Sequence, residues 1–280
     1  MQIFSKTDEF TSFRKSLRTS SIGLVATMGN LHQGHLNLVQ NALNQNETVI
    51  VTIFVNPKQF GPNEDFKKYP RTLSSDIEKL KSLEEYNKII LFCPESPREV
   101  YPEGHSTEIE VKNLDDSLCG KNRPGHFKGV CTVVHRLFQL TKPHIAYFGQ
   151  KDFQQFKIIE KMTLDLEIPI KIKMIPIARD KDGLALSSRN QYLSKEHRIQ
   201  ATTLKNALEN IVTIAQDDFR QAIGLAKERV ENDKRFQYIE VLDAHTLKTP
   251  SMETKNLVVA GAFILGDTRL IDNILLNLKD

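Results

Sequence analysis

The stretch IGLVATMGNLHQGHLNLV, residues 22–39, decides the fold expected for this chain of 280 residues. Its first six residues form an apolar run with β-branched side chains, which is typical of a buried strand. Two glycines and two histidines follow, and then apolar residues recur at helical spacing, at Leu36, Val39 and Leu43. The stretch therefore predicts a strand, a tight turn and a helix, the repeating unit of an α/β protein.

Four further runs predict the other strands of the same sheet, with segments of helical periodicity between them. These runs are TVIVTIFV (48–55), KIILFC (88–93), HIAYFG (144–149) and IKIKMIPI (170–177). Alternating strands and helices form a parallel sheet with right-handed crossovers. We expect a Rossmann-like doubly wound sheet, which binds ligands at the carboxyl ends of its strands.

The pattern changes after the last of these runs. Two helical stretches, about 195–216 and 218–230, precede the strand-like runs FQYIEVLDA, NLVVAGAFIL and TRLIDNILL. The short GDT connection between the last two indicates a hairpin. We therefore expect a Rossmann-like domain over residues 1–175 and a smaller C-terminal α+β domain over residues 176–280.

The composition argues against several classes of protein. Lys and Arg (38) nearly balance Asp and Glu (35), whereas a nucleic-acid-binding protein usually shows a basic face. Cys93, Cys119 and Cys131 lack the spacing of a zinc site or a disulfide framework, so we expect reduced, buried thiols. The pattern of a signal peptide is not seen, and the longest apolar run is too short to span a bilayer. We expect a cytoplasmic protein with a small anionic ligand and with neither nucleic acid nor membrane as a partner.

The turn after the first strand predicts an anion site. Gly29 and Gly34 let the backbone turn tightly, and the helix that begins near Gly34 directs its amides and positive dipole end at a ligand. His32 and His35 are three residues apart, so both can donate hydrogen bonds to one phosphate. A pair of core histidines and a metal site are the alternatives, but no acidic or cysteine third ligand stands at a useful spacing. A phosphate is favoured.

Longer motifs resemble a known family. HQGH, residues 32–35, resembles the His-x-Gly-His signature of the nucleotidyltransferase superfamily. Five motifs in order, TMGNLHQGHLNLV, IFVNPKQFGPNEDFKKYPRT, RPGHFKGV, YFGQKDFQQ and RDKDGLALSSRNQYLS, cover most of residues 25–194 and resemble the pantothenate synthetase family of pantoate–β-alanine ligases. The resemblance implies ATP-dependent ligation of pantoate and β-alanine through a pantoyl-adenylate, with release of AMP and pyrophosphate. It also implies Mg²⁺, which usually binds through substrate phosphates, and a homodimer.

The same resemblance implies roles for single residues. The catalytic residues are His32, His35, Lys151 and Arg189. The residues that bind ATP are Met28, His35, Gly149, Lys151, Asp152, Ile177, Leu186, Ser187, Ser188 and Arg189. The residues that bind pantoate are Thr27, Met28, Gln59 and Gln155, and those at the reacting centre or β-alanine are Asn56, Gln59 and Tyr69. Residues 1–175 then bind nucleotide and pantoate, and residues 176–280 form a lid that carries the Ser-Ser-Arg loop.

The chemistry of the cationic motifs suits these roles, although simpler explanations exist. Lys151 follows a strand end and could stabilise charge that develops on the α-phosphate, or it could be a solvated lysine. The GLALSSRN motif offers hydroxyls, amides and the Arg189 guanidinium to the β- and γ-phosphates. It could equally be a polar surface loop before a helix that Ser194 caps.

The amide side chains suit pantoate for a different reason. Asn56, Gln59 and Gln155 are neutral donors, which orient a carboxylate without pairing away the charge it needs as a nucleophile. Alternatively, such amides cap turns. Arg123 and His126 precede a strongly apolar helix, where they could contact a phosphate or substrate or simply begin that helix.

A few positions are weaker candidates or depart from the family pattern. Asp76 could help to hold magnesium, but an acid that stabilises the first turn of a helix is favoured. Ala26 stands where proline is customary, Gln33 and Gln150 where glutamate is common, and Leu186 where methionine is frequent. None of these removes a catalytic donor, so we expect changed affinities rather than a changed reaction.

Two other functions remain open from the sequence. A nucleotidyltransferase that moves AMP or CMP onto a phosphorylated small molecule would need cations for that second phosphate, whereas the substrate-side motifs here are rich in amides. A non-enzymatic nucleotide-binding module would bind ATP without pyrophosphate chemistry. Fold analogy alone does not separate these functions.

Overall fold

The computed structural model describes residues 1–62 and 64–278, and the chain divides into two compact units. Unit 1 consists of residues Met1–Lys112, Arg123–Gly149 and Ile158–Pro176. Unit 2 consists of residues Asn113–Asn122, Gln150–Lys157 and Ile177–Asp280. The internal segments Asn113–Asn122 and Gln150–Lys157 thus belong with the C-terminal part. The division into functional domains 1–175 and 176–280 stays a prediction.

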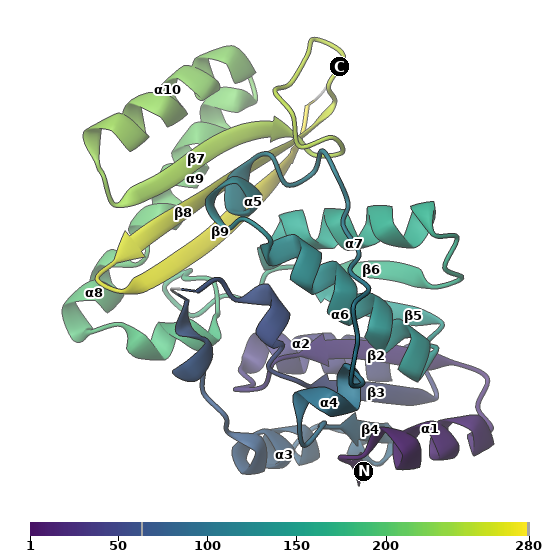
Figure 1. Ribbon diagram of the computed structural model, residues 1–280. Helices are drawn as coiled ribbons and strands as arrows, with labels where there is room; N and C mark the ends of the chain where they lie inside the picture. Colours follow the sequence, from purple (N-terminus) through teal and green to yellow (C-terminus); the bar gives the residue numbers. More distant parts are fainter. Residues whose placement is uncertain (63, 279–280) are drawn as a thin grey trace. The chain divides into compact units, whose positions relative to one another are not determined.

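Unit 1 is built on a six-stranded parallel sheet with the order β1-β4-β3-β2-β5-β6 (Figure 1). Its strands are β1 (Gln2–Phe4), β2 (Ile22–Thr27), β3 (Thr48–Ile53), β4 (Ile89–Phe92), β5 (Ile145–Gly149) and β6 (Lys171–Ile175). From the adjacent strands β2 and β5, chain order runs outward through β3 and β4 on one side and to β6 on the other, and β1 is added at the edge beside β4. The predicted doubly wound sheet is therefore confirmed, with its switch point between these two strands.

Helices cover both faces of this sheet. They are α1 (Thr7–Ser16), α2 (Gln33–Leu43), α3 (Leu73–Lys81), α4 (Pro97–Val100), α6 (His126–Thr141) and the later part of α7 (Phe153–Asp165), with 3-10 turns η1 (Pro57–Gln59), η2 (Asp65–Lys67) and η3 (Tyr86–Lys88). Val39 of α2 and Leu80 of α3 share one buried cluster with Val25, Val51 and Leu91 of the strands. Helix α6 lies on the other side of the sheet from α2 (Figure 1) and contacts α1, α4 and η1. This packing fixes the loops at the carboxyl ends of β2 and β3.

Unit 2 is an antiparallel α+β structure, as predicted. Its sheet has the order β7-β8-β9, with β7 (Phe236–Asp243), β8 (Asn256–Leu265) and β9 (Thr268–Asn277). Its helices are α5 (Leu118–Asn122), α8 (Lys195–Gln200), α9 (Thr203–Ala215) and α10 (Phe219–Asn232), with η4 (Gln150–Asp152) and η5 (Ser188–Tyr192). Leu208 and Ile211 of α9 pack with Val241, Val259 and Phe263 in one core. The GDT hairpin is confirmed, whereas the helix expected over 195–216 is two helices.

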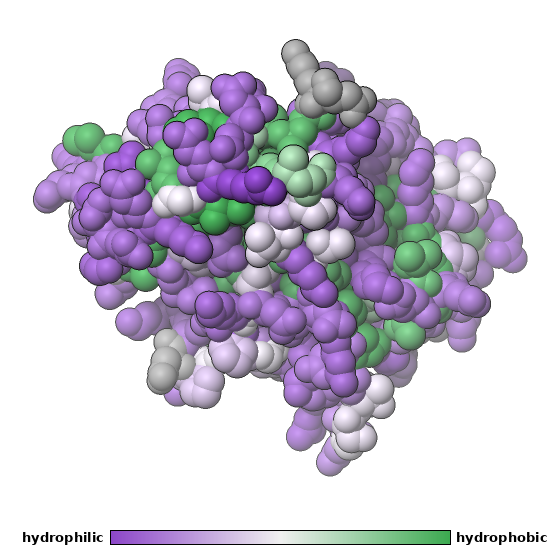
Figure 2. Space-filling view, turned by 90° about the horizontal axis from the view of Figure 1, so that it is seen from above, coloured by the Kyte–Doolittle hydropathy of each residue, from purple (hydrophilic) through white to green (hydrophobic). Residues whose placement is uncertain are grey.

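The surface agrees with the ordinary composition of the chain. The face shown in Figure 2 is largely hydrophilic and carries several separate hydrophobic areas. Cys93, Cys119 and Cys131 are buried thiols, as predicted. Within residues 1–62 and 64–278, the helices are all too short or too polar to cross a membrane.

Candidate active site

The turn after β2 holds a backbone conformation that few side chains adopt. Gly29 has a φ of +82° and Asn30 a φ of +50°, in the left-handed region that favours glycine and tolerates asparagine. The Thr27 hydroxyl accepts a hydrogen bond from the Gly29 N–H at 3.1 Å and donates one to the Thr52 carbonyl of β3 at 2.8 Å. The predicted glycine turn is confirmed, and the Thr27 side chain supports it.

Asp76 anchors the same turn from α3. Its side chain is fully buried, and one carboxylate oxygen accepts the Leu31 N–H at 2.7 Å. The other oxygen accepts the Asn30 N–H at 2.9 Å and the Thr72 hydroxyl at 3.2 Å. Asp76 lies in the first turn of its helix, as favoured from the sequence. Because protein groups engage both oxygens, the alternative assignment of Asp76 to magnesium gains no support from this geometry.

His32 and His35 stand together on the first turn of α2. Their ring centroids are 4.1 Å apart, and both side chains are partly exposed, which argues against the alternative of a core pair. His32 is the N-cap, and its Nδ1 accepts the Gly34 N–H at 3.1 Å. The His32 N–H in turn approaches Nδ1 of His35 at 3.4 Å. A nitrogen that accepts a hydrogen bond carries no proton, so in each neutral ring the proton belongs on Nε2. Two Nε2–H donors on one turn suit the predicted phosphate site.

A cluster of amides follows β3. The Asn56 side chain is 1% exposed, and its Nδ2 donates to the Gly129 carbonyl at 3.1 Å and to Gln59 Oε1 at 3.0 Å. The Gln59 Nε2 lies 3.2 Å from the sulfur of Met28. The structure thus brings Met28, Asn56 and Gln59 together, as their predicted roles require. The buried Asn56 side chain is engaged by protein groups, so its assignment to the reacting centre stays a prediction.

Arg123 and His126 hold this amide-bearing loop rather than only beginning α6. The Arg123 guanidinium pairs with both carboxylate oxygens of Glu64, at 2.7 and 2.5 Å. His126 bridges Arg123 Nη1 at 2.9 Å and the Gln59 carbonyl at 2.8 Å. Burial raises the pKa of Glu64, but the hydrogen bonds and charge of Arg123 outweigh it and hold the pKa below its usual 4.5. Their contact with a phosphate or substrate stays a prediction.

In unit 2, Lys151 lies in η4, directly after the end of β5. Its side chain is only 20% exposed, and its Nζ is 3.5 Å from the Asp152 carboxylate. Asn273 of β9 holds the main chain here, because its Nδ2 donates to the carbonyls of Gln150 at 2.9 Å and Lys151 at 3.1 Å. The Asn273 Oδ1 accepts from Gln150 Nε2 at 3.2 Å. The main chain at Lys151 is therefore held, and its side chain is mostly shielded from solvent, while its role at a phosphate stays a prediction.

The neighbouring residue of β9 holds the Ser-Ser-Arg loop at its base. Asp272 is 4% exposed and pairs with Arg179 at two points, 2.6 and 2.9 Å. Arg179 also donates to the carbonyl of Gly183 at 3.0 Å, where the φ of +90° requires glycine. Adjacent residues of one strand thus position both phosphate-handling elements predicted for unit 2.

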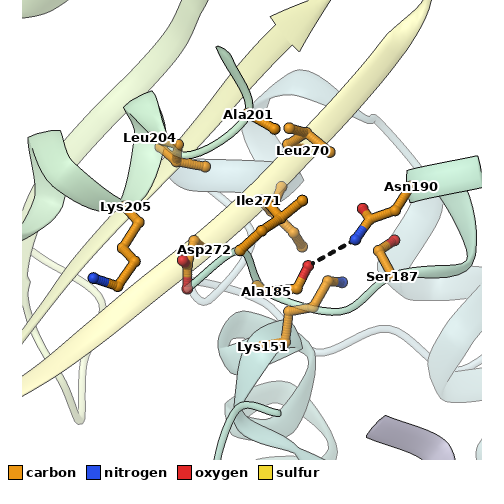
Figure 3. Close-up of a pocket in the computed structure, with 11 residues that line it drawn as sticks. Lys151, Ala185, Ser187, Asn190, Ala201, Leu204, Lys205, Leu270, Ile271 and Asp272 are labelled. Carbon is orange, nitrogen blue, oxygen red and sulfur yellow. Dashed lines mark hydrogen bonds between the residues drawn. The ribbon is translucent and has the colours of Figure 1, made fainter. Parts of the chain in front are cut away.

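A pocket lies within unit 2 between these elements (Figure 3). It is lined by Lys151, Leu184, Ala185, Ser187, Asn190, Ala201, Leu204, Lys205, Leu270, Ile271 and Asp272. Asn190 Nδ2 donates to the Ala185 carbonyl at 3.1 Å, and its Oδ1 is a buried acceptor without a partner in the described part of the chain. Ser187 caps η5 by accepting the Arg189 N–H at 3.3 Å. Lys151 and Ser187, both expected to contact ATP, line this pocket together.

The other residues predicted to bind substrates lie in η4, η5, the first turn of α7, the end of β5 and the loop before η5. Ser188 and Arg189 lie in η5, Asp152 in η4, Gln155 in α7 and Gly149 at the end of β5, while Ile177 and Leu186 flank the loop held by Arg179. Tyr69 is 5% exposed and packs edge-on against Phe60 with ring centroids 6.0 Å apart. Ser194 caps α8 by accepting the His197 N–H, as predicted. The cap does not involve Ser187, Ser188 or Arg189, so it is compatible with their predicted role at phosphates.

Several residues that hold the candidate site were missed from the sequence. They include Tyr101, whose hydroxyl donates to Asn56 Oδ1 at 2.8 Å, and Glu64, Arg179, Asp272 and Asn273. The last two carried a usable signal, because two adjacent polar residues interrupt an otherwise apolar strand-like run, TRLIDNILL. Glu64 and Tyr101 stand in polar segments where such residues are ordinary, and only the folded arrangement identifies their partners.

Comparisons with known proteins agree with the expected family. The chain matches the family model described as pantoate-beta-alanine ligase over residues 2–275. It is 44% identical over 283 residues to a pantothenate synthetase of Thermotoga petrophila, covering 99% of this chain and 100% of that protein. It is 45% identical over 259 residues to a pantothenate synthetase of Acetivibrio thermocellus, covering 91% of each.

Solved structures give the same result. A crystal structure of pantothenate synthetase from Thermus thermophilus matches with a TM-score of 0.89 and 39% identity, covering 98% of this chain and 99% of that one. A pantoate-beta-alanine ligase from Francisella tularensis, complexed with beta-gamma ATP and beta-alanine, matches with a TM-score of 0.75 and 38% identity, covering 98% and 97%. From its sequence and its fold, the chain belongs to the pantoate-beta-alanine ligase family.

Proposed function

We propose that this chain ligates pantoate and β-alanine to form pantothenate, driven by ATP. A pantoate carboxylate oxygen attacks the α-phosphorus of ATP, which forms the pantoyl-adenylate as pyrophosphate leaves. The amine of β-alanine then attacks the acyl carbon, loses a proton and displaces AMP. The observation that carries this proposal is the family match over residues 2–275, nearly the whole chain. The ATP and β-alanine of the Francisella tularensis complex support the choice of substrates.

The donors of the candidate site suit the first step. The Nε2–H groups of His32 and His35 donate to phosphate oxygens of ATP. Lys151 and Arg189 supply positive charge to the α-phosphate and to the departing pyrophosphate, where negative charge builds in the transition state. Ser187 and Ser188 donate to the same phosphates. The rings of His32 and His35 are already oriented by hydrogen bonds of the first turn of α2, so little reorganisation is needed there at the moment of reaction.

Neutral amides orient the second substrate. Gln59 and Gln155 donate to pantoate, which Thr27 and Met28 also contact. Because amides carry no charge, the pantoate carboxylate keeps its nucleophilic character. Gln59 and Tyr69 are assigned to the reacting centre or to β-alanine, and Asn56 holds the Gln59 side chain there.

Magnesium fits this function through the phosphates of ATP, whose charge it neutralises when bound. The described residues contain no group of three or more His, Cys, Asp or Glu side chains placed to hold a metal by themselves. A site shared with the phosphates is therefore the arrangement that these residues support. We also propose a homodimer in the cytoplasm and a lid role for residues 176–280, as the family resemblance implies.

Pyrophosphate exchange into ATP tests the first half-reaction. Labelled pyrophosphate, ATP and magnesium are incubated with the protein, with and without pantoate and without β-alanine. We expect exchange only when pantoate is present, because only then can the adenylate form and reverse. Exchange that is equally fast with and without pantoate contradicts the proposal. The absence of exchange in the presence of pantoate, in protein that still binds ATP, contradicts it as well. Adding β-alanine should then convert the intermediate to pantothenate.

A further inference from the structure

Tyr101 underlies the loop that carries the amides of unit 1. It follows α4, and its side chain is 8% exposed. Its hydroxyl donates to Asn56 Oδ1 at 2.8 Å. Its ring packs edge-on against Phe54, with centroids 6.1 Å apart, and the Lys58 Nζ lies 5.5 Å from its centroid. One buried ring therefore contacts three residues of the segment between β3 and Gln59.

All four hydrogen-bonding positions of the Asn56 amide are used inside the protein. Its Oδ1 accepts from the Tyr101 hydroxyl and from the Lys58 N–H at 3.2 Å, while its Nδ2 donates to the Gly129 carbonyl and to Gln59 Oε1. A backbone N–H can only donate and a carbonyl can only accept, so these two backbone groups exclude the flipped amide. Burial raises the pKa of Tyr101, so its hydroxyl keeps the proton that it donates.

The orientation of Asn56 dictates that of Gln59. Asn56 Nδ2 is a donor, so the oxygen of the Gln59 amide must face it. The Gln59 Nε2 is then directed at Met28, whose thioether sulfur is a weak acceptor at 3.2 Å. A carboxylate is a far better acceptor than a thioether. An anionic ligand therefore gains by taking the Gln59 donor, and a flipped Gln59 would instead present its oxygen to that anion.

We propose that Tyr101 and Asn56 are positioning residues that lock the Gln59 amide with its NH₂ group toward pantoate. The inference rests on the proposed function, since it takes pantoate as the ligand of Gln59. Tyr101 stands at the far end of this series of hydrogen bonds and touches no substrate. It makes the pantoate site selective for an anion, because the series leaves Gln59 with its NH₂ donor, rather than its oxygen, directed at the ligand.

The test removes the Tyr101 hydroxyl alone. Tyr101→Phe keeps the ring contacts and deletes one buried hydrogen bond. The loss of one such bond corresponds to about a fivefold change in an equilibrium constant. We expect KM for pantoate to rise about fivefold while KM for ATP stays unchanged. Tyr147→Phe is the matched control, because Tyr147 is 1% exposed and its hydroxyl lies 2.8 Å from Asn46 Nδ2 in the same unit. It should leave the KM values for both substrates unchanged.

Two further variants complete the test. Gln59→Ala should raise KM for pantoate at least as much as Tyr101→Phe. The double variant should match Gln59→Ala, because the effects of two substitutions in one hydrogen-bond network are not additive. Asn56→Asp keeps the shape of the side chain but removes the donor to Gln59, so KM for pantoate should rise more than in Tyr101→Phe. This variant also serves if Tyr101→Phe folds poorly.

Three results overturn the proposal. A pantoate effect of Tyr101→Phe no larger than that of Tyr147→Phe, with Gln59→Ala still impaired, refutes the positioning role and leaves the proposed function intact. Equal increases in KM for ATP and pantoate indicate general loosening of unit 1 and also refute it. An unchanged KM for pantoate in Gln59→Ala removes both the positioning role and the assignment of Gln59 to pantoate, whereas pantoate-dependent pyrophosphate exchange would still support the ligase.

Discussion

The role of Asp76 as the anchor of the β2–α2 turn makes a quantitative expectation possible. In Asp76→Ala, the N–H groups of Leu31 and Asn30 lose their carboxylate acceptors at 2.7 and 2.9 Å. A buried donor that loses its partner costs about 1–3 kcal/mol. Leu31 is fully buried and Asn30 only partly, so water can reach one of the two groups. We therefore expect the free energy of unfolding to fall by about 2–4 kcal/mol.

The same substitution should reduce catalysis, because the turn leads directly into His32 and His35. A displacement of about 1 Å in a positioned group can cost on the order of 100-fold in rate. Pantoate-dependent pyrophosphate exchange should fall on that order in Asp76→Ala. In Asp76→Asn one oxygen remains as an acceptor, so the loss of stability should be about half as large.

Denaturant unfolding and pyrophosphate exchange measure the two effects, and amide hydrogen exchange of β2 and α2 assigns the lost stability to this region. Glu78→Ala is the control, because Glu78 lies on the same helix and its side chain is 71% exposed. That control should change the free energy of unfolding by less than about 0.5 kcal/mol. If Asp76→Ala is as stable as the native protein and needs only more magnesium for exchange, the anchor role is refuted and a metal role is favoured.

Two other changes test the loop that carries Gln59. The pKa of Glu64 is lowered by Arg123 against the effect of burial, so this pair stabilises the fold above pH 4.5 and the stabilisation is lost as the pH falls through the lowered pKa. In thermal melts, Glu64→Gln should therefore lower Tm at neutral pH, with a difference that shrinks below pH 4.5; a constant difference would contradict this. A Cβ on Gly129 would lie 2.1 Å from the Lys58 carbonyl oxygen, so Gly129→Ala should cost about 3 kcal/mol and raise KM for pantoate. Gly224→Ala, where a Cβ meets nothing within 4 Å, should stabilise its helix by up to about 1 kcal/mol, and equal effects of the two substitutions would refute the steric argument.

Much of the fold could be predicted because its signals are local. The run IGLVAT coincides with β2 (Ile22–Thr27), since a continuous apolar stretch of this length forms a strand buried on both faces. β1 was missed because its three residues, Gln2–Phe4, are too few to show a pattern. The break between α8 and α9 was missed as well, because helical periodicity continues across residues 201–202.

The candidate site was predictable only in part, for a different reason. Residues such as His32 and Lys151 could be named because they stand in short motifs at the ends of strands. The pairs that support them could not be assigned, even where a residue such as Asn273 stands out in the sequence, because the partners are distant along the chain: Tyr101 and Asn56 are 45 residues apart, and Asn273 and Gln150 are 123 apart. A single sequence contains no signal for such pairs, since they arise from the register of strands and loops.

His32 and Gln59 of unit 1 are oriented in the same way by hydrogen bonds inside the protein. In His32, the nitrogen that can accept is occupied by the Gly34 N–H, and in Gln59 the oxygen is occupied by Asn56. Each internal hydrogen bond thus consumes an acceptor and assigns the donor to the other end of the side chain. A surface prepared in this way favours anions, because a ligand that brings only acceptors finds donors already oriented. ATP and pantoate are both anions, so the proposed contacts of His32 with ATP and of Gln59 with pantoate would use donors that these internal hydrogen bonds have already oriented.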